Sequence, residues 1–341
     1  MRSIRWTLLL ILLAVCTVAP AQRRHRPVDP KATREARQLL KYLYQQRGQA
    51  IISGHHNYNS NLNAYSDRVH EICGEYPAIW GSDFSHLGQG KLGKAQAATD
   101  EAIRKHRDGY IITLMWHVGR PQDEAPYAWK ESVQAEMSEA EWAALFDPAS
   151  DLHRRWQAQV DEIAGYLRQL QAAQVPVLWR PYHEMNGIWF WWGDKPGDTG
   201  YARLWNMLYE RLVVHHGIHN LIWVWNANAP RDLENDEAYA YADYFPGLER
   251  VDVLAADVYH NDYRQSHHDD LLALAGGKLI ALGEVGTVPT HAILDQQPQW
   301  SWFMVWANWV DRANTPEDIQ ALYAYPRTRN HDEVQPLPWV K

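Results

Sequence analysis

The chain has 341 residues, 46% of them hydrophobic, which is enough for one large domain or two ordinary ones. Its 33 Lys and Arg against 41 Asp and Glu give a formal net charge of −8, without a long basic block. This balance argues against nucleic acid and anionic membrane surfaces as partners, whereas 18 tryptophans and 18 tyrosines suit the apolar faces of neutral ligands.

Residues 1–21 predict a cleaved export signal and not part of the fold. Two arginines precede the apolar run Leu8–Val15, and Ala19-Pro20-Ala21 offers a small-residue cleavage site. The run is too short to span a bilayer, so we expect no transmembrane segment and a secreted or periplasmic protein. A lipid anchor on Cys16 is the less favoured alternative. Cleavage would leave Cys73 as the only cysteine, which excludes an internal disulfide.

Residues 22–341 predict a single domain in which apolar runs alternate with amphipathic helices. Eight runs predict strands: Ala50–Ser53, Ala78–Trp80, Tyr110–Trp116, Val175–Trp179, Asn220–Trp225, Val251–Val258, Leu279–Leu282 and Ser301–Trp306. Helices are predicted at Ala32–Gly48, Lys94–Arg107, Leu152–Ala173, Tyr201–His216, His267–Ala275 and Pro316–Tyr325. Eight such units favour an α/β fold of the (β/α)8 TIM barrel type, although a doubly wound open sheet would alternate in the same way.

Polar and aromatic side chains follow the predicted strands, where a barrel would bring them to one face. In chain order they are His55 and His56, Asp83, Trp116 and His117, Glu184, Asn226, Tyr259, Glu284 and Trp306. The long interruption Gly119–Ser150 is expected to form part of a cleft wall at this face. The barrel therefore predicts a functional cleft at the carboxyl ends of its strands.

Glu184 and Glu284 follow the fourth and seventh strands, on opposite sides of the predicted barrel mouth. Hydrolysis of a glycosidic bond with retention needs an acid that protonates the leaving oxygen and a carboxylate that attacks the anomeric carbon. Aromatic surroundings would raise the pKa of Glu184, whereas hydrogen bonds would keep Glu284 ionised. Spacing alone leaves a second interpretation open, in which each glutamate is a structural ion-pair partner.

The segment Val175–Gly193 places four tryptophans around Glu184, which points to a sugar ligand. We expect Trp179 to pack within the barrel and Trp189 to stack on sugar, with Trp191 and Trp192 divided between cleft wall and core. A tryptophan-rich core segment beside a structural glutamate is the alternative.

The motifs WRPYHEMNGIWFWWG (179–193) and GEVG (283–286) resemble glycoside hydrolase family 26. The resemblance extends through ISGHH (52–56), PAIWGSDFS (77–85), TLMWH (113–117) and ADVY (256–259), and so covers nearly all of the mature chain. It implies a retaining, endo-acting hydrolase of β-1,4-mannosidic bonds in mannan, glucomannan or galactomannan, without a cofactor. Action on β-1,3-xylan or mixed-linkage β-glucan stays open.

The resemblance also implies roles by position. Glu184 resembles the acid/base and Glu284 the nucleophile, with His183 and Tyr259 in support. His117 with Trp116 resembles a subsite on the non-reducing side of the cut. Trp189 and Trp306 resemble stacking platforms. Trp192, Asp83 and Arg180 are further candidates for substrate binding, although an arginine at a strand end also neutralises buried carboxylates.

Two other classes compete with this interpretation. A metal-dependent hydrolase would draw ligands from His55, His56, His117, His183 and His260, but no metal-type histidine spacing lies at a strand end, so we expect no metal. A carbohydrate-binding protein without catalysis would explain the tryptophans but not two glutamates at opposite strand ends. We expect a monomer that acts on a polysaccharide or oligosaccharide.

Overall fold

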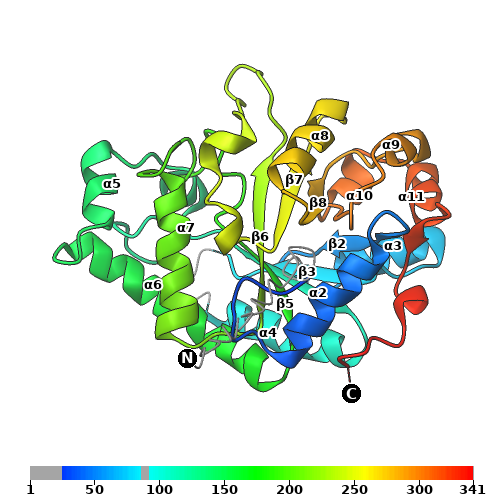
Figure 1. Ribbon diagram of the computed structural model, residues 1–341, viewed down its shortest axis with the longest axis horizontal. Coiled ribbons are helices and arrows are strands. Elements are labelled where there is room, and N and C mark those ends of the chain that lie inside the picture. The colour runs from blue at the N-terminus through cyan, green and yellow to red at the C-terminus, as the bar shows by residue number, and fades with distance from the viewer. Residues whose placement is uncertain (1–24, 86–91, 341) are drawn as a thin grey trace, which may run out of the picture.

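The protein is described here by a computed structural model of residues 25–85 and 92–340 (Figure 1). The predicted export signal and Cys16 lie outside the described residues. Seven parallel strands form one curled sheet in sequence order. They are β2 (Gly54–His56), β3 (Ile79–Asp83), β4 (Ile111–Trp116), β5 (Val177–Pro181), β6 (Leu221–Asn228), β7 (Val253–Val258) and β8 (Leu279–Val285).

The segment 300–306 closes this sheet into a barrel. On one side it meets β8, where Ser301 N donates to Ile280 O at 2.8 Å. On the other side it meets the first strand region, where Val305 N donates to Gly54 O at 3.0 Å. Four isolated parallel bridges make the same two connections. The predicted eighth strand is therefore present as a closing segment, and the (β/α)8 barrel is confirmed. The short strands β1 (Ile51–Ile52) and β9 (Thr328–Arg329) pair separately.

Helices surround the barrel largely where the sequence predicts them (Figure 1). They are α2 (Arg34–Gln46), α3 (Ala64–Cys73), α4 (Leu92–Arg107), α5 (Glu139–Leu145), α6 (Asp151–Ala172), α7 (Tyr201–Tyr209), α8 (Gln265–Leu274), α9 (His291–Gln296), α10 (Trp309–Arg312) and α11 (Pro316–Tyr323). One expectation was wrong in detail, because the helix predicted at Tyr201–His216 changes to a π-helical segment at Glu210–His215. The short 3-10 turns Tyr241–Tyr244 and Leu248–Arg250 lie between β6 and β7, where no helix was predicted.

The barrel interior is apolar at its base. Alternate strand residues such as Ile79, Leu178 and Val253 join one buried cluster, to which α2 adds Leu39 and Leu43. Because these strand residues lie near the strand starts, α2 packs against the amino-terminal end of the barrel. The base is therefore a solid core, and polar side chains are left to the opposite end.

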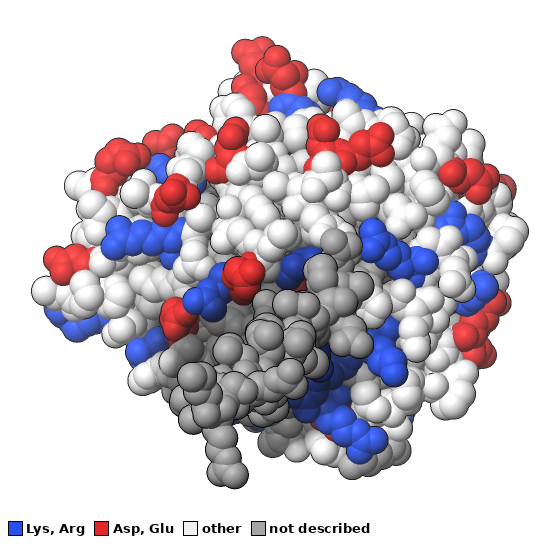
Figure 2. Space-filling view, in the orientation of Figure 1, with Lys and Arg blue, Asp and Glu red and all other residues white. Residues whose placement is uncertain are grey.

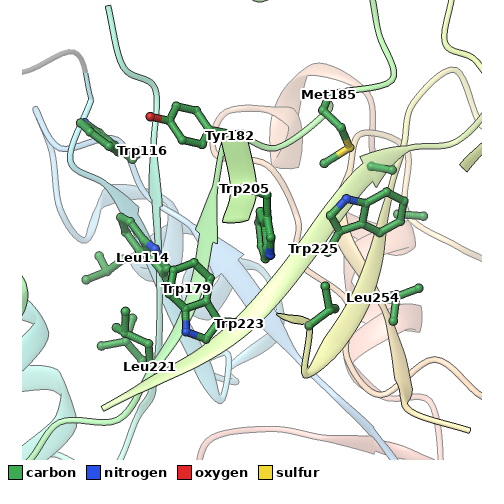
Figure 3. Close-up of a cluster of buried hydrophobic side chains, with 14 of the residues drawn as sticks. Leu114, Trp116, Trp179, Tyr182, Met185, Trp205, Leu221, Trp223, Trp225 and Leu254 are labelled. Carbon is green, nitrogen blue, oxygen red and sulfur yellow. The ribbon is translucent and has the colours of Figure 1, made fainter. Parts of the chain in front are cut away.

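The other strand face packs against the helices in a second, aromatic layer (Figure 3). Trp116 alternates with Ile112 and Leu114 on β4 and shares their outward face, where it is fully buried and lies against Tyr182. Trp179 occupies the corresponding face of β5. The sequence interpretation was wrong for both tryptophans. Trp116 was expected to contact substrate, but strand alternation places it in the core between strands and helices. Trp179 was expected within the barrel, but alternation places it on the outer face of β5.

A β-bulge sets the direction of Glu284. Ala256 pairs with Leu282, but the next residue of β7, Asp257, pairs with Glu284, so Gly283 is the extra residue. Leu282 belongs to the outer layer, so regular alternation would give Gly283 the inward position and turn Glu284 away from the cleft. The bulge instead brings Glu284 inward. Only glycine fits at 283, since a Cβ there would lie 2.0 Å from Asn226 Oδ1.

The surface agrees with a chain of mixed charge. In Figure 2, acidic and basic side chains are interspersed over the face that is visible. Within the described residues, no helix is both long and apolar enough to cross a membrane. Cys73, the one cysteine within the described residues, is a free thiol.

Candidate active site

An open cleft of about 650 Å³ lies at the carboxyl ends of the strands. Its walls combine carboxyl groups, histidines and aromatic rings. The lining residues include His117, Trp129, His183, Glu184, Trp189, Phe190, Arg231, Asp236, Tyr259, His260, Glu284, Trp306, Trp309 and Arg312. Trp129 and Gln134 come from the interruption Gly119–Ser150, which confirms that this segment forms part of the wall.

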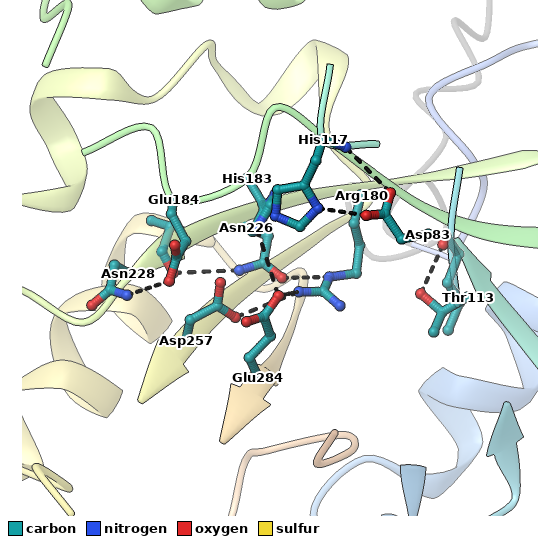
Figure 4. Close-up of polar contacts among 12 residues, drawn as sticks. Asp83, Thr113, His117, Arg180, His183, Glu184, Asn226, Asn228, Asp257 and Glu284 are labelled. Atoms are coloured by element: carbon teal, nitrogen blue, oxygen red, sulfur yellow. Dashed lines mark hydrogen bonds and ion pairs between the residues drawn. The ribbon is translucent and has the colours of Figure 1, made fainter. Parts of the chain in front are cut away.

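Glu184 has a strained backbone, and each oxygen of its carboxyl group accepts a hydrogen bond, one of them from Asn228 (Figure 4). Its φ is +53°, a left-handed conformation that is uncommon for a residue with a side chain. The strain is held by backbone hydrogen bonds from Glu184 N to Asn226 O at 2.7 Å and from Gly187 N to Glu184 O at 3.0 Å. Asn228 Nδ2 donates to Oε1 at 2.5 Å, and Trp189 Nε1 donates to Oε2 at 2.7 Å.

The pKa of Glu184 is raised to about 7, first by burial and then by the negative charge of Glu284. The hydrogen bonds from Asn228 and Trp189 act in the opposite direction but do not cancel this rise. Near neutral pH, Glu184 therefore holds its proton in a substantial fraction of molecules, as a general acid must.

Glu284 has partners that favour its ionised form. Arg180 Nη2 donates to Oε1 at 2.9 Å, and Tyr259 Oη donates to Oε2 at 2.7 Å. The pKa of Glu284 is raised above its ordinary value, because burial raises it by more than Arg180, Tyr259 and His117 lower it. His183 Nε2 lies 3.7 Å from Oε1, too far for a hydrogen bond. Burial and the neighbouring cations His117 and Arg180 hold the pKa of His183 well below its usual range, so it is neutral.

A third carboxyl group, that of Asp257, lies beside this pair. One oxygen from each of Glu184, Asp257 and Glu284 lies within 4.8 Å of the others. Burial and the charge of Glu284 raise the pKa of Asp257 well above its usual range. Crowding of this kind prevents all three groups from ionising together.

The histidines that the competing metal interpretation would use do not form a group of three close ligand atoms in the described residues. In residues 25–85 and 92–340, the trio of carboxylates is the group with three ligand atoms close enough for one ion, and it includes no histidine. Arg180 already supplies positive charge there, at 2.9 Å from Glu284 and 3.6 Å from Asp257. This geometry favours the carboxylate pair over a histidine metal centre.

His117 lines the cleft and is held by Asp83 behind it. Its Nδ1 lies 2.6 Å from Asp83 Oδ2, and its backbone N donates to Oδ1 at 3.2 Å. Burial would lower the pKa of His117, but the Asp83 carboxylate raises it above its ordinary value. Asp83 is buried and does not line the cleft. Its predicted contact with substrate is therefore corrected to a role in holding His117.

Two more predicted substrate contacts are corrected in the same way. Arg180 is 1% exposed and faces Glu284 and Asn226 instead of the cleft, so it neutralises buried carboxylates. Trp192 is fully buried, stacks on Phe190 with ring centroids 4.4 Å apart and donates to His183 O at 2.8 Å. It supports the cleft wall from behind. Trp191 is also core.

Trp306 lines the cleft where the sequence predicts a platform. Its ring stacks on His56, with centroids 4.0 Å apart and planes 14° apart. Burial holds the pKa of His56 well below its usual range, so this backing ring is neutral. His56 covers one face of this partly buried indole, which also lies near the rings of Tyr58 and His117 and lines the cleft.

Several cleft residues were missed from the sequence. Asn228, two residues after Asn226 at the end of β6, donates directly to Glu184. Arg231 and Asp236 come from the loop after β6, and Trp309 and Arg312 come from α10. Arg312 lies over the Trp309 ring at 4.8 Å. The WNAN run at 225–228 was the only sequence signal for this group; nothing marked the loop residues.

Comparison with known sequences identifies relatives of the whole barrel. Residues 28–333 match the family described as Glycosyl hydrolase family 26. A mannan endo-1,4-beta-mannosidase of Thermothelomyces thermophilus is 32% identical over 320 residues, which cover 90% of this chain and 63% of the relative. One from Bacillus subtilis strain 168 is 27% identical over 359 residues, which cover 96% of this chain and 94% of the relative. The chain spans about half the length of two Piromyces relatives.

Solved structures give the same result. GH26A from Muricauda sp. MAR_2010_75 is 50% identical with a TM-score of 0.87, covering 90% of this chain and 99% of the other. A beta-mannanase from a symbiotic protist of the termite Reticulitermes speratus, solved with a gluco-manno-oligosaccharide, is 27% identical with a TM-score of 0.78. That alignment covers 91% of this chain and 97% of the other. The match over residues 28–333 shows that this chain belongs to glycosyl hydrolase family 26.

Proposed function

We propose that this protein is a retaining, endo-acting hydrolase of β-1,4-mannosidic bonds, with Glu284 as nucleophile and Glu184 as acid/base. The observation that carries the proposal is the close pair of unlike carboxyl groups. Their nearest ligand oxygens lie within 4.8 Å, which suits the short spacing of about 5 Å used in retention. One member has a pKa of about 7, and the other accepts hydrogen bonds from Arg180 and Tyr259.

In the first step, the Glu284 carboxylate attacks the anomeric carbon while the bond to the leaving oxygen breaks. Glu184 gives its proton to that oxygen, so the departing sugar leaves as an alcohol. Glu284 is then bound covalently to the remaining sugar. Glu184 is left as a carboxylate, with Asn228 and Trp189 donating to its two oxygens.

In the second step, a water molecule attacks the same carbon from the side that the first sugar left. Glu184 takes a proton from this water, and the bond from Glu284 to the sugar breaks. Two displacements at one carbon restore its starting configuration. Both glutamates return to their original protonation states, which completes the cycle.

The substrate is inferred from the relatives. The relatives from T. thermophilus, Piromyces and B. subtilis are named mannan endo-1,4-beta-mannosidases, and one solved neighbour holds a gluco-manno-oligosaccharide. The open cleft and its partly buried tryptophans, Trp189 and Trp306, suit a neutral polysaccharide chain. We therefore propose mannan, glucomannan or galactomannan, with an active protein that is monomeric and exported.

A panel of defined oligosaccharides and polysaccharides tests the substrate class. Products from mannan, galactomannan, β-1,3-xylan and mixed-linkage β-glucan should be resolved over time. Early release of mixed oligosaccharides from mannan supports endo-acting mannanase activity. Cleavage of xylan or glucan alone contradicts it, and binding to mannan without any product would support the carbohydrate-binding alternative.

A further inference from the structure

Every protein partner of the Glu184 carboxyl group is a hydrogen-bond donor in this arrangement. The indole N–H of Trp189 can only donate. Asn228, in contrast, has an amide that donates from one end and accepts at the other. The function of Glu184 as an acid therefore depends on which end of Asn228 faces it.

Arg231 determines that orientation. Its Nη1 donates to Asn228 Oδ1, and a guanidinium has no acceptor that could bond the other end of the amide. The amide oxygen of Asn228 is thus held toward Arg231, and its NH2 group is turned toward Glu184 Oε1 at 2.5 Å. If the amide turned over, its oxygen would accept the proton of Glu184 and draw it away from the cleft.

Arg231 is itself held rigidly. Its Nη2 and Nε donate to the two carboxylate oxygens of Asp236 at 2.6 and 2.9 Å, and its side chain is 7% exposed. Its backbone exchanges two hydrogen bonds of 2.9 Å with Ala238. Ala238 also forms an antiparallel bridge with Gly187, three residues after Glu184. The loop after β6 and the loop that carries Glu184 are therefore tied together.

The same guanidinium also contacts the second donor. It lies over the Trp189 ring at 5.0 Å. The benzene ring of this indole packs over Gly187, where an added Cβ would come within 2.2 Å of Trp189 Cη2. Arg231 thus contacts both Asn228 and Trp189, the two groups that donate to Glu184.

We propose that Arg231 is a positioning residue for proton transfer: by holding the Asn228 amide in its donating orientation, it leaves the leaving-group oxygen as the only acceptor for the Glu184 proton. The inference rests on the proposed role of Glu184 as acid/base. Lysine cannot replace this residue fully, because a single ammonium does not reach Asp236 and Asn228 with the planar geometry of a guanidinium.

The test compares two leaving groups in one set of variants. Mannotetraose needs a proton on its leaving sugar, whereas a 2,4-dinitrophenyl β-mannobioside releases an acidic phenol that leaves without one. The value of kcat/KM reports the first displacement for both. The variants are Arg231→Met, Asn228→Ala and the double variant. Arg250→Met is the matched control. Like Arg231, Arg250 lies over an aromatic ring, that of Tyr209 at 4.5 Å, and pairs with a carboxylate, that of Glu210. It differs in its position, because it lies just before the amino end of β7, remote from the cleft.

We expect Arg231→Met to lower kcat/KM for mannotetraose about 10- to 100-fold and for the aryl substrate less than about threefold, as for loss of proton transfer alone. Asn228→Ala removes the amide oxygen that could capture the proton, so it should lose less kcat/KM for mannotetraose than Arg231→Met does. The double variant should resemble Asn228→Ala instead of showing the product of the two losses, because the change at Arg231 acts through Asn228. Arg250→Met should match the wild type on both substrates.

Equal losses on the two substrates, full additivity in the double variant, or normal activity of Arg231→Met would overturn the proposal. If Arg231→Met does not fold by circular dichroism, Arg231→Lys decides: a loss on mannotetraose that exceeds the loss on the aryl substrate supports the proposal, and equal losses or normal activity overturn it. A wild-type protein inactive on both substrates would instead contradict the proposed function, so the two failures are distinguishable.

Discussion

Arg180 donates to Glu284 at 2.9 Å, and both side chains are almost completely buried. The same guanidinium donates from Nε to Asn226 at 2.6 Å. Arg180 thus neutralises part of the charge that three close carboxyl groups would otherwise place in one site, and it does so without facing the cleft. Through this contact, a buried residue of β5 lowers the pKa of the proposed nucleophile.

Replacing Arg180 with methionine should raise the pKa of Glu284, because the cation that favours its ionised form is removed. Less Glu284 would then be ionised at a given pH, so the acidic limb of the kcat/KM profile should move to higher pH. A matched surface change, Arg68→Met, removes exposed pairs and should leave the profile unchanged. An unchanged acidic limb in Arg180→Met would contradict this role.

The wild-type pH profile should have an alkaline limb set by Glu184. The protonated form of Glu184 is the active one, and its pKa is raised to about 7, so this form is lost as pH rises through that value. At pH values above this pKa, we expect kcat/KM for mannotetraose to fall about tenfold for each pH unit. A profile that stays flat to about pH 9 would contradict the assignment of Glu184 as general acid.

Glu284→Ala and Glu184→Gln should each lower turnover of mannan oligosaccharides by about three orders of magnitude or more. Both variants should still bind mannotetraose by isothermal titration calorimetry, since the aromatic walls remain. Glu75→Gln changes an exposed glutamate away from the cleft and serves as the control. Near-normal turnover in either cleft variant would show that the assignment is wrong.

Trp306 and Trp116 should respond differently to mutation. Trp306→Ala removes a ring from the cleft and should weaken the binding of mannan oligosaccharides about tenfold, which corresponds to a loss of about 1.4 kcal/mol of binding free energy. Trp116→Phe should lower the free energy of unfolding by about 1–2 kcal/mol with little change in KM, because this ring lies in the core. Thermal unfolding and steady-state kinetics of both variants check the contrast. If KM rose in Trp116→Phe but not in Trp306→Ala, the cleft ring would be Trp116 and the assignment of Trp306 would be wrong.

Gly283→Ala should abolish most activity, since the new Cβ would lie 2.0 Å from Asn226 Oδ1 and 2.7 Å from Asp257 Oδ1. The expected cause is displacement of Glu284, whose direction depends on the bulge at this glycine. Gly165→Ala in α6 is the control, because a Cβ there meets nothing within 4 Å, and it should stabilise the helix by about 0.5–1 kcal/mol. Normal activity in Gly283→Ala would show that the bulge is not needed.

Strand positions and the residues that follow them were predictable because apolar runs in a barrel are long and regular. The directions of individual side chains were less so. Counting alternation correctly would have placed Trp116 with Ile112 and Leu114 on the outer face. No alternation rule would have placed Glu284, because a bulge reverses the pattern just before it, and nothing local in GEVG distinguishes a bulge from a regular strand.

The contacts of the acid/base were the least predictable part of the site. Trp189 is five residues from Glu184 in sequence and was found from its motif. Arg231 is 47 residues away, on a loop without periodicity, and its effect passes through Asn228. Such contacts depend on how two loops pair at the barrel mouth, which is a property of the tertiary structure.

The stereochemistry of the first product tests the central claim most directly. Proton NMR should follow a β-linked mannan oligosaccharide immediately after enzyme is added, before the anomers equilibrate. Two displacements through Glu284 predict that the new reducing end is released in the β configuration and only later converts to the mixture. Initial release of the α anomer would mean inversion and would contradict the roles given to Glu184 and Glu284.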